Sequence, residues 1–373
     1  MGFYNLMKVL FITQAVYLSR SLITHITNIE NDNVDLIINK KLIGEDINIK
    51  YAHKVFKNKI NIIYECILPL YDCYIGKSTV STHKLSFMIK ELVYPISMIK
   101  VKNVMKSGNY SYIYLNSLIL HRLITKDYPF ILHVRERYDG SDSSVYSSMM
   151  KASGVIFIDD AVAEPFKHLN LKHKIILNNP INMCQDNKNK LKIKIDTNKT
   201  IFSVIGRIED GKGIPLIIDA FKKAHIKNSL LLIVGYGSID YVNNCRNRAY
   251  NCKNIIFYGV EENIQLIYDI TDYVIRGENE QCVGRTMYEG LYSGCEVIVP
   301  GDDITRVFES DLFKNMIHFY KPSDLKELTI IFEKFNGNKI YNRIYKSNVK
   351  EYLQKFNKFI SECQGSTKES SII

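Results

Sequence analysis

Short apolar runs alternate with longer, helix-length segments from one end of the chain to the other. The runs occupy residues 8–13, 34–39, 61–68, 112–116, 130–134, 154–159 and 174–178, and then 201–206, 230–235, 255–259, 272–277 and 295–301. Each run is apolar on both faces, as a strand buried between two layers of helices must be. The pattern therefore predicts an α/β protein of βα units with parallel strands, arranged in two successive series.

A polar stretch separates the two series. Residues 182–200 are rich in Asn and Lys, a composition typical of a linker between domains. The chain of 373 residues also exceeds the length that one hydrophobic core usually serves. We therefore expect an N-terminal domain over residues 1–183 and a C-terminal domain over residues 184–345.

The segment 346–373 predicts one more element. Its apolar residues Tyr352, Phe356 and Ile360 recur at a spacing of four, which is the pattern of an amphipathic helix. We expect this helix to pack back toward the N-terminal domain. The polar residues 365–373 after it are expected to be disordered.

The composition narrows the class of protein. Hydrophobic residues make up 46% and charged residues 24% of the chain, which is typical of a globular protein. The N-terminal apolar run is short and lacks a cleavage site, and no stretch reaches the roughly 20 apolar residues of a membrane-spanning helix. The eight cysteines form no CxxC pair and no metal-ligand cluster with histidines. We therefore expect a cytoplasmic protein with free thiols and no metal.

The net charge of +10 comes mostly from the first half of the chain. A basic surface suits nucleic acid, anionic lipid or a phosphorylated substrate, and charge alone does not choose among them. No basic patch with stacking aromatic residues stands out, so we expect no nucleic-acid partner. Residues 77–107 hold six lysines interleaved with apolar residues. This segment predicts either a helix that docks on an anionic membrane or a surface helix with an ordinary core face.

The segment GRIEDGKG after the run at 201–206 is a candidate phosphate-binding loop. Gly206 allows a tight turn, while Arg207 and Lys212 lie five residues apart and are able to converge on a diphosphate. A solvated basic turn is an equally good interpretation of this loop alone. The next apolar run ends at Gly235 in a GxG turn, at the strand end where doubly wound folds bind ligands.

A second candidate lies at the start of a predicted helix from about Gly284 to residue 293. The amides of Gly284, Arg285 and Thr286 would face a phosphate, because a helix N-terminus carries partial positive charge. Glu289, farther along this helix, is able to accept hydrogen bonds from sugar hydroxyls or to remain a solvated helix residue.

In order and spacing, these motifs over residues 201–300 resemble the C-terminal domain of glycosyltransferase family 4. The resemblance implies that Arg207 and Lys212 hold a donor diphosphate and that Glu289 binds the nucleotide ribose. It implies that the backbone at Val260, after the sequence FYG, meets the nucleobase. Position 281 would face the donor sugar, and here the family's glutamate is replaced by Gln281, with Glu280 beside it.

The same resemblance implies a GT-B fold, in which two Rossmann-like domains with parallel sheets face each other across a cleft. It implies a retaining, metal-independent hexosyltransferase that needs no cofactor. The donor would be a nucleotide-diphosphate sugar, with UDP favoured over GDP. The acceptor would be a glycan or a polyprenyl-diphosphate-linked oligosaccharide in bacterial cell-surface polysaccharide synthesis, such as lipopolysaccharide or capsule. The protein would then work on the inner face of the plasma membrane.

The N-terminal half resembles the family more loosely. His133 matches a strand-end histidine that faces the donor sugar in relatives, although a lone histidine at a strand end is otherwise a structural residue. Arg135 and Arg137 are candidates to meet an acceptor phosphate or are simply solvated. Two other functions stay open: a GT-B sugar-nucleotide epimerase, and a non-catalytic GT-B subunit that binds a sugar nucleotide.

The replacement at position 281 gives a prediction. If the Gln281 side chain faces the donor sugar, Gln281→Glu restores negative charge beside a positive charge that develops on the sugar, and turnover rises. Steady-state nucleotide release with saturating donor measures this change. Unchanged donor affinity and rate would show that the side chain does not face the sugar.

Overall fold

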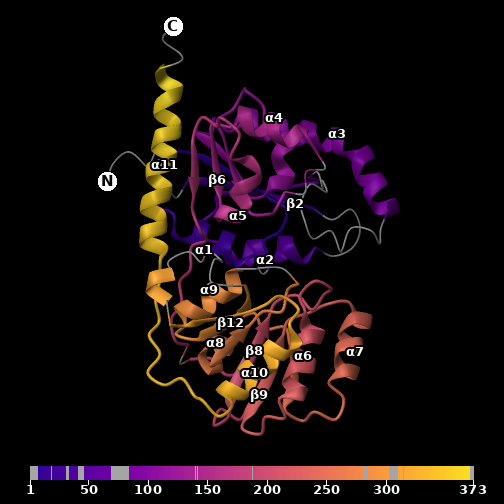
Figure 1. Cartoon of the computed structure of the whole chain (residues 1–373). Helices are drawn as coiled ribbons and strands as arrows, with labels where there is room; N and C mark the ends of the chain where they lie inside the picture. The colour runs from indigo at the N-terminus through magenta and orange to yellow at the C-terminus, as the bar shows by residue number, and fades with distance from the viewer. Residues whose placement is uncertain are drawn as a thin grey trace. The chain divides into compact units, whose positions relative to one another are not determined.

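The computed structural model describes residues 7–17, 19–30, 33–40, 46–68, 84–138, 140, 142–186, 188–279, 284–301, 310–313 and 315–369. For residues 84–94, 310, 311 and 366–369 it describes the backbone only. The chain forms two compact units (Figure 1). Unit 1 comprises residues 1–180 and 349–373, and unit 2 comprises residues 181–348. The sequence predicts the two boundaries between these units after residues 183 and 345, and the structure places them after residues 180 and 348.

Unit 1 is built on a parallel sheet of seven strands in the order β3-β2-β1-β4-β5-β6-β7. The strands are β1 (Val9–Thr13), β2 (Val34–Asn39), β3 (Ile62–Cys66), β4 (Tyr112–Leu115), β5 (Phe130–Val134), β6 (Gly154–Phe157) and β7 (Lys174–Ile176). The chain adds strands outward from β1 in one direction and then returns to β4 beside β1. The switch point of this doubly wound sheet therefore lies between β1 and β4.

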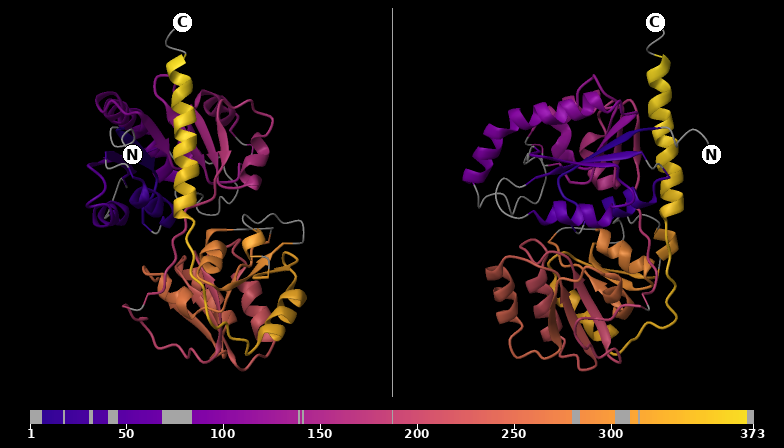
Figure 2. Two further views of the ribbon diagram at one scale, coloured as in Figure 1. Left: turned by 90° about the vertical axis from the view of Figure 1, so that its left-hand side faces the viewer. Right: turned by 180° about the vertical axis from the view of Figure 1, so that it is seen from behind.

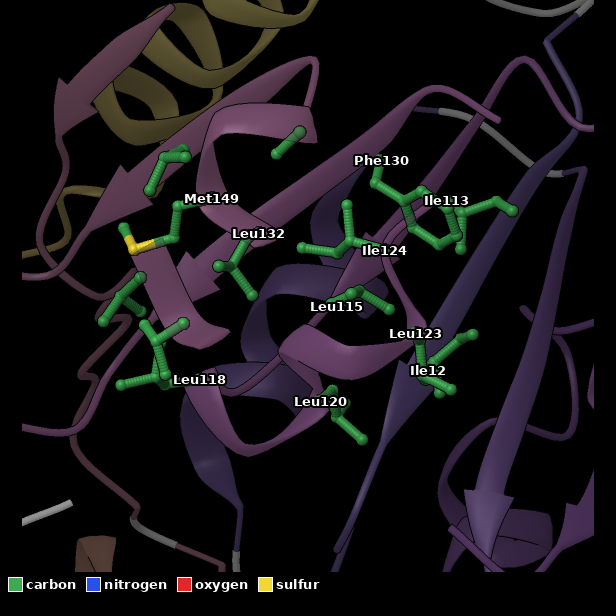
Figure 3. Close-up of a cluster of buried hydrophobic side chains, with 14 of the residues drawn as sticks. Ile12, Ile113, Leu115, Leu118, Leu120, Leu123, Ile124, Phe130, Leu132 and Met149 are labelled. Atoms are coloured by element: carbon green, nitrogen blue, oxygen red, sulfur yellow. The ribbon is translucent and has the colours of Figure 1, made fainter. Parts of the chain in front are cut away.

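Helices cover both faces of this sheet. They are α1 (Arg20–Asn28), α2 (Ile47–Val55), α3 (Lys84–Ser107), η3 (Leu118–Leu123), α4 (Ser144–Lys151), α5 (Asp160–Ala163), η4 (Glu164–Phe166) and α11 (Val349–Glu369). One core packs α3, η3 and α4 against the sheet through buried aliphatic residues such as Ile113, Leu118 and Met149 (Figure 3). A second core lies on the opposite face, against α1, α2 and α11.

The C-terminal helix α11 belongs to unit 1, along which it runs in all three views (Figures 1 and 2). Tyr352, Phe356 and Ile360 are buried in the second core, on the face that the four-residue spacing predicts. The hydroxyl of Tyr352 lies 2.6 Å from Nδ1 of His25 on α1, and Phe356 packs edge-on against the same ring. Burial, followed by the charge of Arg135, lowers the pKa of His25 to about 3, so this imidazole is neutral.

Unit 2 is built on a parallel sheet of six strands in the order β10-β9-β8-β11-β12-β13. The strands are β8 (Thr200–Ile205), β9 (Ser229–Val234), β10 (Ile255–Gly259), β11 (Tyr273–Ile275), β12 (Glu296–Pro300) and β13 (Ile317–Tyr320). The helices are α6 (Ile214–Lys223), α7 (Ile239–Arg248), α8 (Gln265–Ile270), α9 (Arg285–Tyr292), η5 (Ser310–Phe313) and α10 (Leu325–Phe335). One core packs α6, α7 and α10 on one face, and the other packs α8 and α9 on the opposite face. The predicted fold class of two parallel-sheet, Rossmann-like domains is confirmed.

The structure differs from the prediction at three places. β13 is an additional edge strand with half-buried residues, and so it lacks a strongly apolar run. The polar stretch 182–200 is not a free linker, because Met183 and Ile195 are buried in the core of unit 2. Helix α11 continues to Glu369, past the point where disorder was expected, since each further helical residue adds a backbone hydrogen bond at little cost.

Among the helices that the structure describes, none combines the length and apolar character that a bilayer crossing requires. The basic segment 77–107 is described in part, as helix α3 from Lys84 onward. Ile96 and Ile99 on this helix are 69% and 60% exposed, while Val101 and Met105 are buried. The helix thus has both a core face and an exposed apolar stretch.

The packing of α11 gives a prediction. Phe356→Ala removes a fully buried ring, and such changes cost about 3–5 kcal/mol. We expect faster amide exchange throughout unit 1, measured by hydrogen exchange and mass spectrometry because the two units can unfold separately. Lys358→Ala on the exposed face of the same helix is the control and should leave exchange unchanged. Equal exchange in both variants would contradict this packing.

Candidate functional site

The loops that carry the candidate residues of unit 2 meet at the carboxyl edge of its sheet. The sheet order puts β8 beside β11, and the chain changes direction at this point, so the switch point lies between these strands. The loop after β8 contains Arg207 and Lys212, and the loop after β11 leads to α9. Crevices at this place in doubly wound sheets are where ligands bind.

Glycines allow the backbones of these loops to touch. Gly213, the N-cap of α6, has φ +59°, and a Cβ there would overlap the carbonyl of Gly277 after β11. Gly235 has φ +145°, and a Cβ there would overlap the carbonyl of Gly206. The amide of Gly206 donates to Val234, and that of Gly235 donates to Gly259. The turns after β8, β9 and β10 are thus joined into one surface.

Lys212 is tied to the loop after β11 by a chain of ion pairs. Its Nζ lies 3.4 Å from Oε1 of Glu278, and Glu278 also pairs with the guanidinium of Arg276. Nη1 of Arg276 in turn donates to Oγ1 of Thr286 on α9, at 2.8 Å. Burial would raise the pKa of Glu278, but Arg276 and Lys212 together hold it below its usual value. The carboxylate of Glu278 is therefore ionised at neutral pH and is the ion-pair partner of the Lys212 ammonium.

Arg276 and Glu278 were missed by the sequence reasoning, which placed Arg276 inside the apolar run 272–277 and named only Glu280 and Gln281 in the loop that follows. Their signal was the sequence RGE within and directly after that run, at the carboxyl end of a strand. A Cβ on Gly284 would overlap the Arg276 guanidinium, so the glycine at the N-cap of α9 makes room for this side chain.

The other predicted residues of the first loop and of α9 have partners of their own. Nη1 of Arg207 lies 3.1 Å from Glu209, and the side chain is about half exposed. Glu289 is only 3% exposed and accepts hydrogen bonds from Nε of Arg285 and the hydroxyl of Tyr268, each at 2.9 Å. A ribose that bound Glu289 would therefore displace or share one of these bonds.

Three further predicted positions are Val260, Glu280 and Gln281. The carbonyl of Val260 accepts a hydrogen bond from Nζ of Lys192 at 2.7 Å, which places a lysine beside the predicted nucleobase position. Glu280 and Gln281 lie outside the described residues. No group of His, Cys, Asp and Glu side chains among the residues described here has the arrangement of a metal site.

His133 is fully buried in β5 of unit 1. Its Nδ1 contacts the hydroxyl of Tyr114 and lies 3.2 Å from Nη2 of Arg135. Burial, together with the charges of Arg135 and His25, holds the pKa of His133 well below its usual value. With no exposed surface, the imidazole in this conformation supports neighbouring side chains rather than reaching a ligand.

The comparison with protein families decides what unit 2 is. The model of the family "Glycosyl transferases group 1" matches residues 185–352. This stretch is a glycosyltransferase group 1 domain. It contains both loops at the switch point, and so the cations of these loops belong to a glycosyltransferase domain.

A curated relative agrees with this assignment. The chain is 25% identical over 187 residues to alpha-monoglucosyldiacylglycerol synthase of Streptococcus pneumoniae (strain ATCC BAA-255 / R6). The matched stretch is 47% of this chain and 42% of that protein, so the chain spans less than half of this relative's length.

Solved structures show the same fold over nearly the whole chain. Anabaena HepE in complex with UDP and glucose matches with a TM-score of 0.64 at 14% identity, covering 98% of this chain and 100% of that one. The lipopolysaccharide outer core galactosyltransferase WaaB matches with a TM-score of 0.59 at 16% identity, covering 95% and 99%. With its group 1 domain and two Rossmann-like sheets, the chain has the GT-B fold.

The contact between Gly213 and Gly277 gives a prediction. Gly213→Ala adds a Cβ that overlaps the backbone of Gly277, so the two loops must separate. The loss of folding free energy should therefore exceed the about 1–2 kcal/mol that a left-handed φ alone costs. We expect a lower melting temperature, measured by differential scanning calorimetry. Gly211→Ala is the matched control, because its φ is +82° but no atom lies within 4 Å of the added Cβ. Similar losses in the two variants would show that the contact is unimportant.

Proposed function

We propose that the chain is a retaining, metal-independent hexosyltransferase that uses a nucleotide-diphosphate sugar, with UDP favoured over GDP. The observation that carries this proposal is the cluster of Lys212, Arg276 and the start of α9 at the switch point of the group 1 domain. A diphosphate that entered this site would replace Glu278 as the partner of Lys212, and Arg207 is near enough along the loop to join it.

Two relatives support a sugar-nucleotide donor and an acceptor that carries a lipid. Anabaena HepE has been crystallised with UDP and glucose, and the pneumococcal relative is by name a synthase of a glucosylated diacylglycerol. We propose a glycan or a polyprenyl-diphosphate-linked oligosaccharide as the acceptor, in synthesis of lipopolysaccharide, capsule or a related bacterial cell-surface polysaccharide. The exposed Ile96 and Ile99 on α3, together with the exposed Lys100 and Lys102 on the same helix, support docking on an anionic membrane.

The proposed reaction exchanges one bond to the anomeric carbon for another on the same face of the sugar. The bond from C1 to the β-phosphate oxygen breaks, and a bond from C1 to the acceptor hydroxyl oxygen forms. The hydroxyl proton passes to the departing diphosphate, which leaves as the nucleoside diphosphate. Lys212 and Arg207 stabilise the negative charge that develops on this leaving group, and the amides at Gly284, Arg285 and Thr286 add partial positive charge.

The remaining predicted residues have roles in binding the donor. We propose that Gly206 and Gly235 give the donor close access to the backbone, that Val260 meets the base and that Glu289 binds the ribose. Gln281 or Glu280 would face the donor sugar. His133 would act indirectly, through its contact with Arg135.

Lys212→Ala tests the proposal. Loss of one preorganised cation at the leaving group should cut turnover by roughly 10²–10³-fold. The measurement is nucleotide release from UDP-sugars and GDP-sugars, with and without a lipid-linked acceptor and with a chelator present. Lys223→Ala, an exposed lysine on α6, is the matched control and should keep full activity.

The same assay separates the other functions. Near wild-type turnover by Lys212→Ala would contradict the assignment of this lysine. Nucleotide binding with no turnover of any donor would favour a non-catalytic subunit. Conversion of the sugar nucleotide without release of the nucleoside diphosphate would favour an epimerase.

A further inference from the structure

Arg135 lies at the carboxyl edge of the sheet of unit 1, the kind of edge on which the candidate loops of unit 2 also lie. It follows the last residue of β5 directly, at the carboxyl edge of the sheet and one strand from the switch point beside β4. Asn116, which follows β4, and Asn179, which lies just beyond β7, reach the same side chain. Three strand ends thus converge on one guanidinium.

Among the residues that the structure describes, the side chains that contact this guanidinium are neutral. Nε donates to Oδ1 of Asn116 at 2.9 Å, Nη1 donates to Oδ1 of Asn179, and Nη2 lies 3.2 Å from Nδ1 of His133. The hydroxyl of Tyr114 contacts the same imidazole nitrogen. His133 is neutral because burial is the largest cause that lowers its pKa, and it therefore accepts from Arg135 rather than repelling it.

The nearest carboxylate along the chain does not neutralise Arg135. Both oxygens of Glu136 accept from neutral donors: Oε1 from the hydroxyl of Ser117 at 2.6 Å, and Oε2 from the backbone amides of Leu118 and Arg135. Within the described ranges no ion pair involves Arg135. Several other arginines do have a carboxylate partner, namely Arg122 with Asp142, Arg207 with Glu209, Arg248 with Asp219, Arg276 with Glu278, Arg285 with Glu289 and Arg343 with Asp272.

A partly dehydrated guanidinium with neutral partners costs free energy of desolvation unless an anion binds to it. Arg135 is half-buried, so it has lost part of its hydration, and Asn116 and Asn179 are each more than nine-tenths buried. Amide oxygens fix the direction of the guanidinium without cancelling its charge. A guanidinium that is held in this way is preorganised for a planar or tetrahedral oxyanion, to which it donates charge-assisted hydrogen bonds.

We infer that Arg135 binds an oxyanion of the acceptor substrate, either a phosphate of a lipid-linked sugar or a carboxylate of an acidic sugar. The oxyanion site itself rests on the contacts within unit 1, whereas its assignment to the acceptor rests on the proposed function. The donor diphosphate has its own cations on the loops of unit 2, and unit 1 lies almost wholly outside the stretch that matches the group 1 family. Asn116, Asn179 and His133 are positioning residues for Arg135.

The test measures binding to the full chain by isothermal titration calorimetry, with UDP in excess to occupy the donor loops. Three probes distinguish the source of the oxyanion. Farnesyl diphosphate carries phosphate, methyl glucuronide carries a carboxylate, and farnesol carries neither. We expect one of the two anionic probes to bind at least about tenfold more tightly than farnesol, which corresponds to the strength of a charge-assisted hydrogen bond.

The decisive variant is Asn116→Asp. It places a carboxylate oxygen next to Nε of Arg135 at almost unchanged volume, and so it neutralises the guanidinium without removing it. We expect it to weaken binding of the anionic probe at least about tenfold, as does Arg135→Gln. Arg122→Gln is the matched control, because this arginine of unit 1 already pairs with Asp142 and should leave binding unchanged.

Unchanged affinity in Asn116→Asp overturns the inference, as does a wild-type chain that binds neither anionic probe. If Arg135→Gln fails to fold, as judged by its melting curve, Asn116→Asp decides alone. Failure of the proposed function is a different result. A chain that binds no UDP and releases no nucleotide, yet binds the anionic probe through Arg135, would contradict the transferase and keep the oxyanion site.

Discussion

The candidate donor site depends on one close approach between two backbones. Gly213 and Gly277 lie so near each other that neither position has room for a side chain toward the other. This contact brings the end of the loop after β8 against the loop after β11, and it is what sets Lys212 opposite Glu278. The ion pairs to Arg276 and the link to Thr286 on α9 follow from that placement. A steric constraint thus determines where the charges of this site lie.

The two units differ in the partners of the cations at the carboxyl edges of their sheets. In unit 2, Lys212 pairs with Glu278 and Arg207 pairs with Glu209, so the diphosphate that we propose would have to displace these carboxylates. In unit 1, the described side chains that contact Arg135 are neutral, so the anion that we propose would meet no competing carboxylate among them.

Much of the fold was predictable because buried parallel strands are apolar on both faces, and this property can be read directly from the sequence. β13 was not predictable in this way, because an edge strand with half-buried residues has no continuous apolar run. The role of the stretch 182–200 was misread because its buried residues, such as Met183 and Ile195, are few among many polar ones. In the site, glycines and basic residues near strand ends gave a signal, and the loops that carry them do meet. Arg276 and Glu278 gave none of comparable strength, since their importance comes from a partner on another loop.

Unit 2 is one continuous segment inserted into unit 1, and its two ends are joined to each other. Residues 182 and 347 form a β-bridge, while the amide of Met183 donates to Lys346 and that of Asn348 donates to Ile181. Unit 1, by contrast, needs Tyr352 and Phe356 from the far end of the chain to complete its second core. During synthesis on the ribosome, unit 2 has all its residues before unit 1 does. The order of completion is therefore the reverse of the order of translation: the first 180 residues must wait, with the face that α11 covers still open, until the last helix has been made.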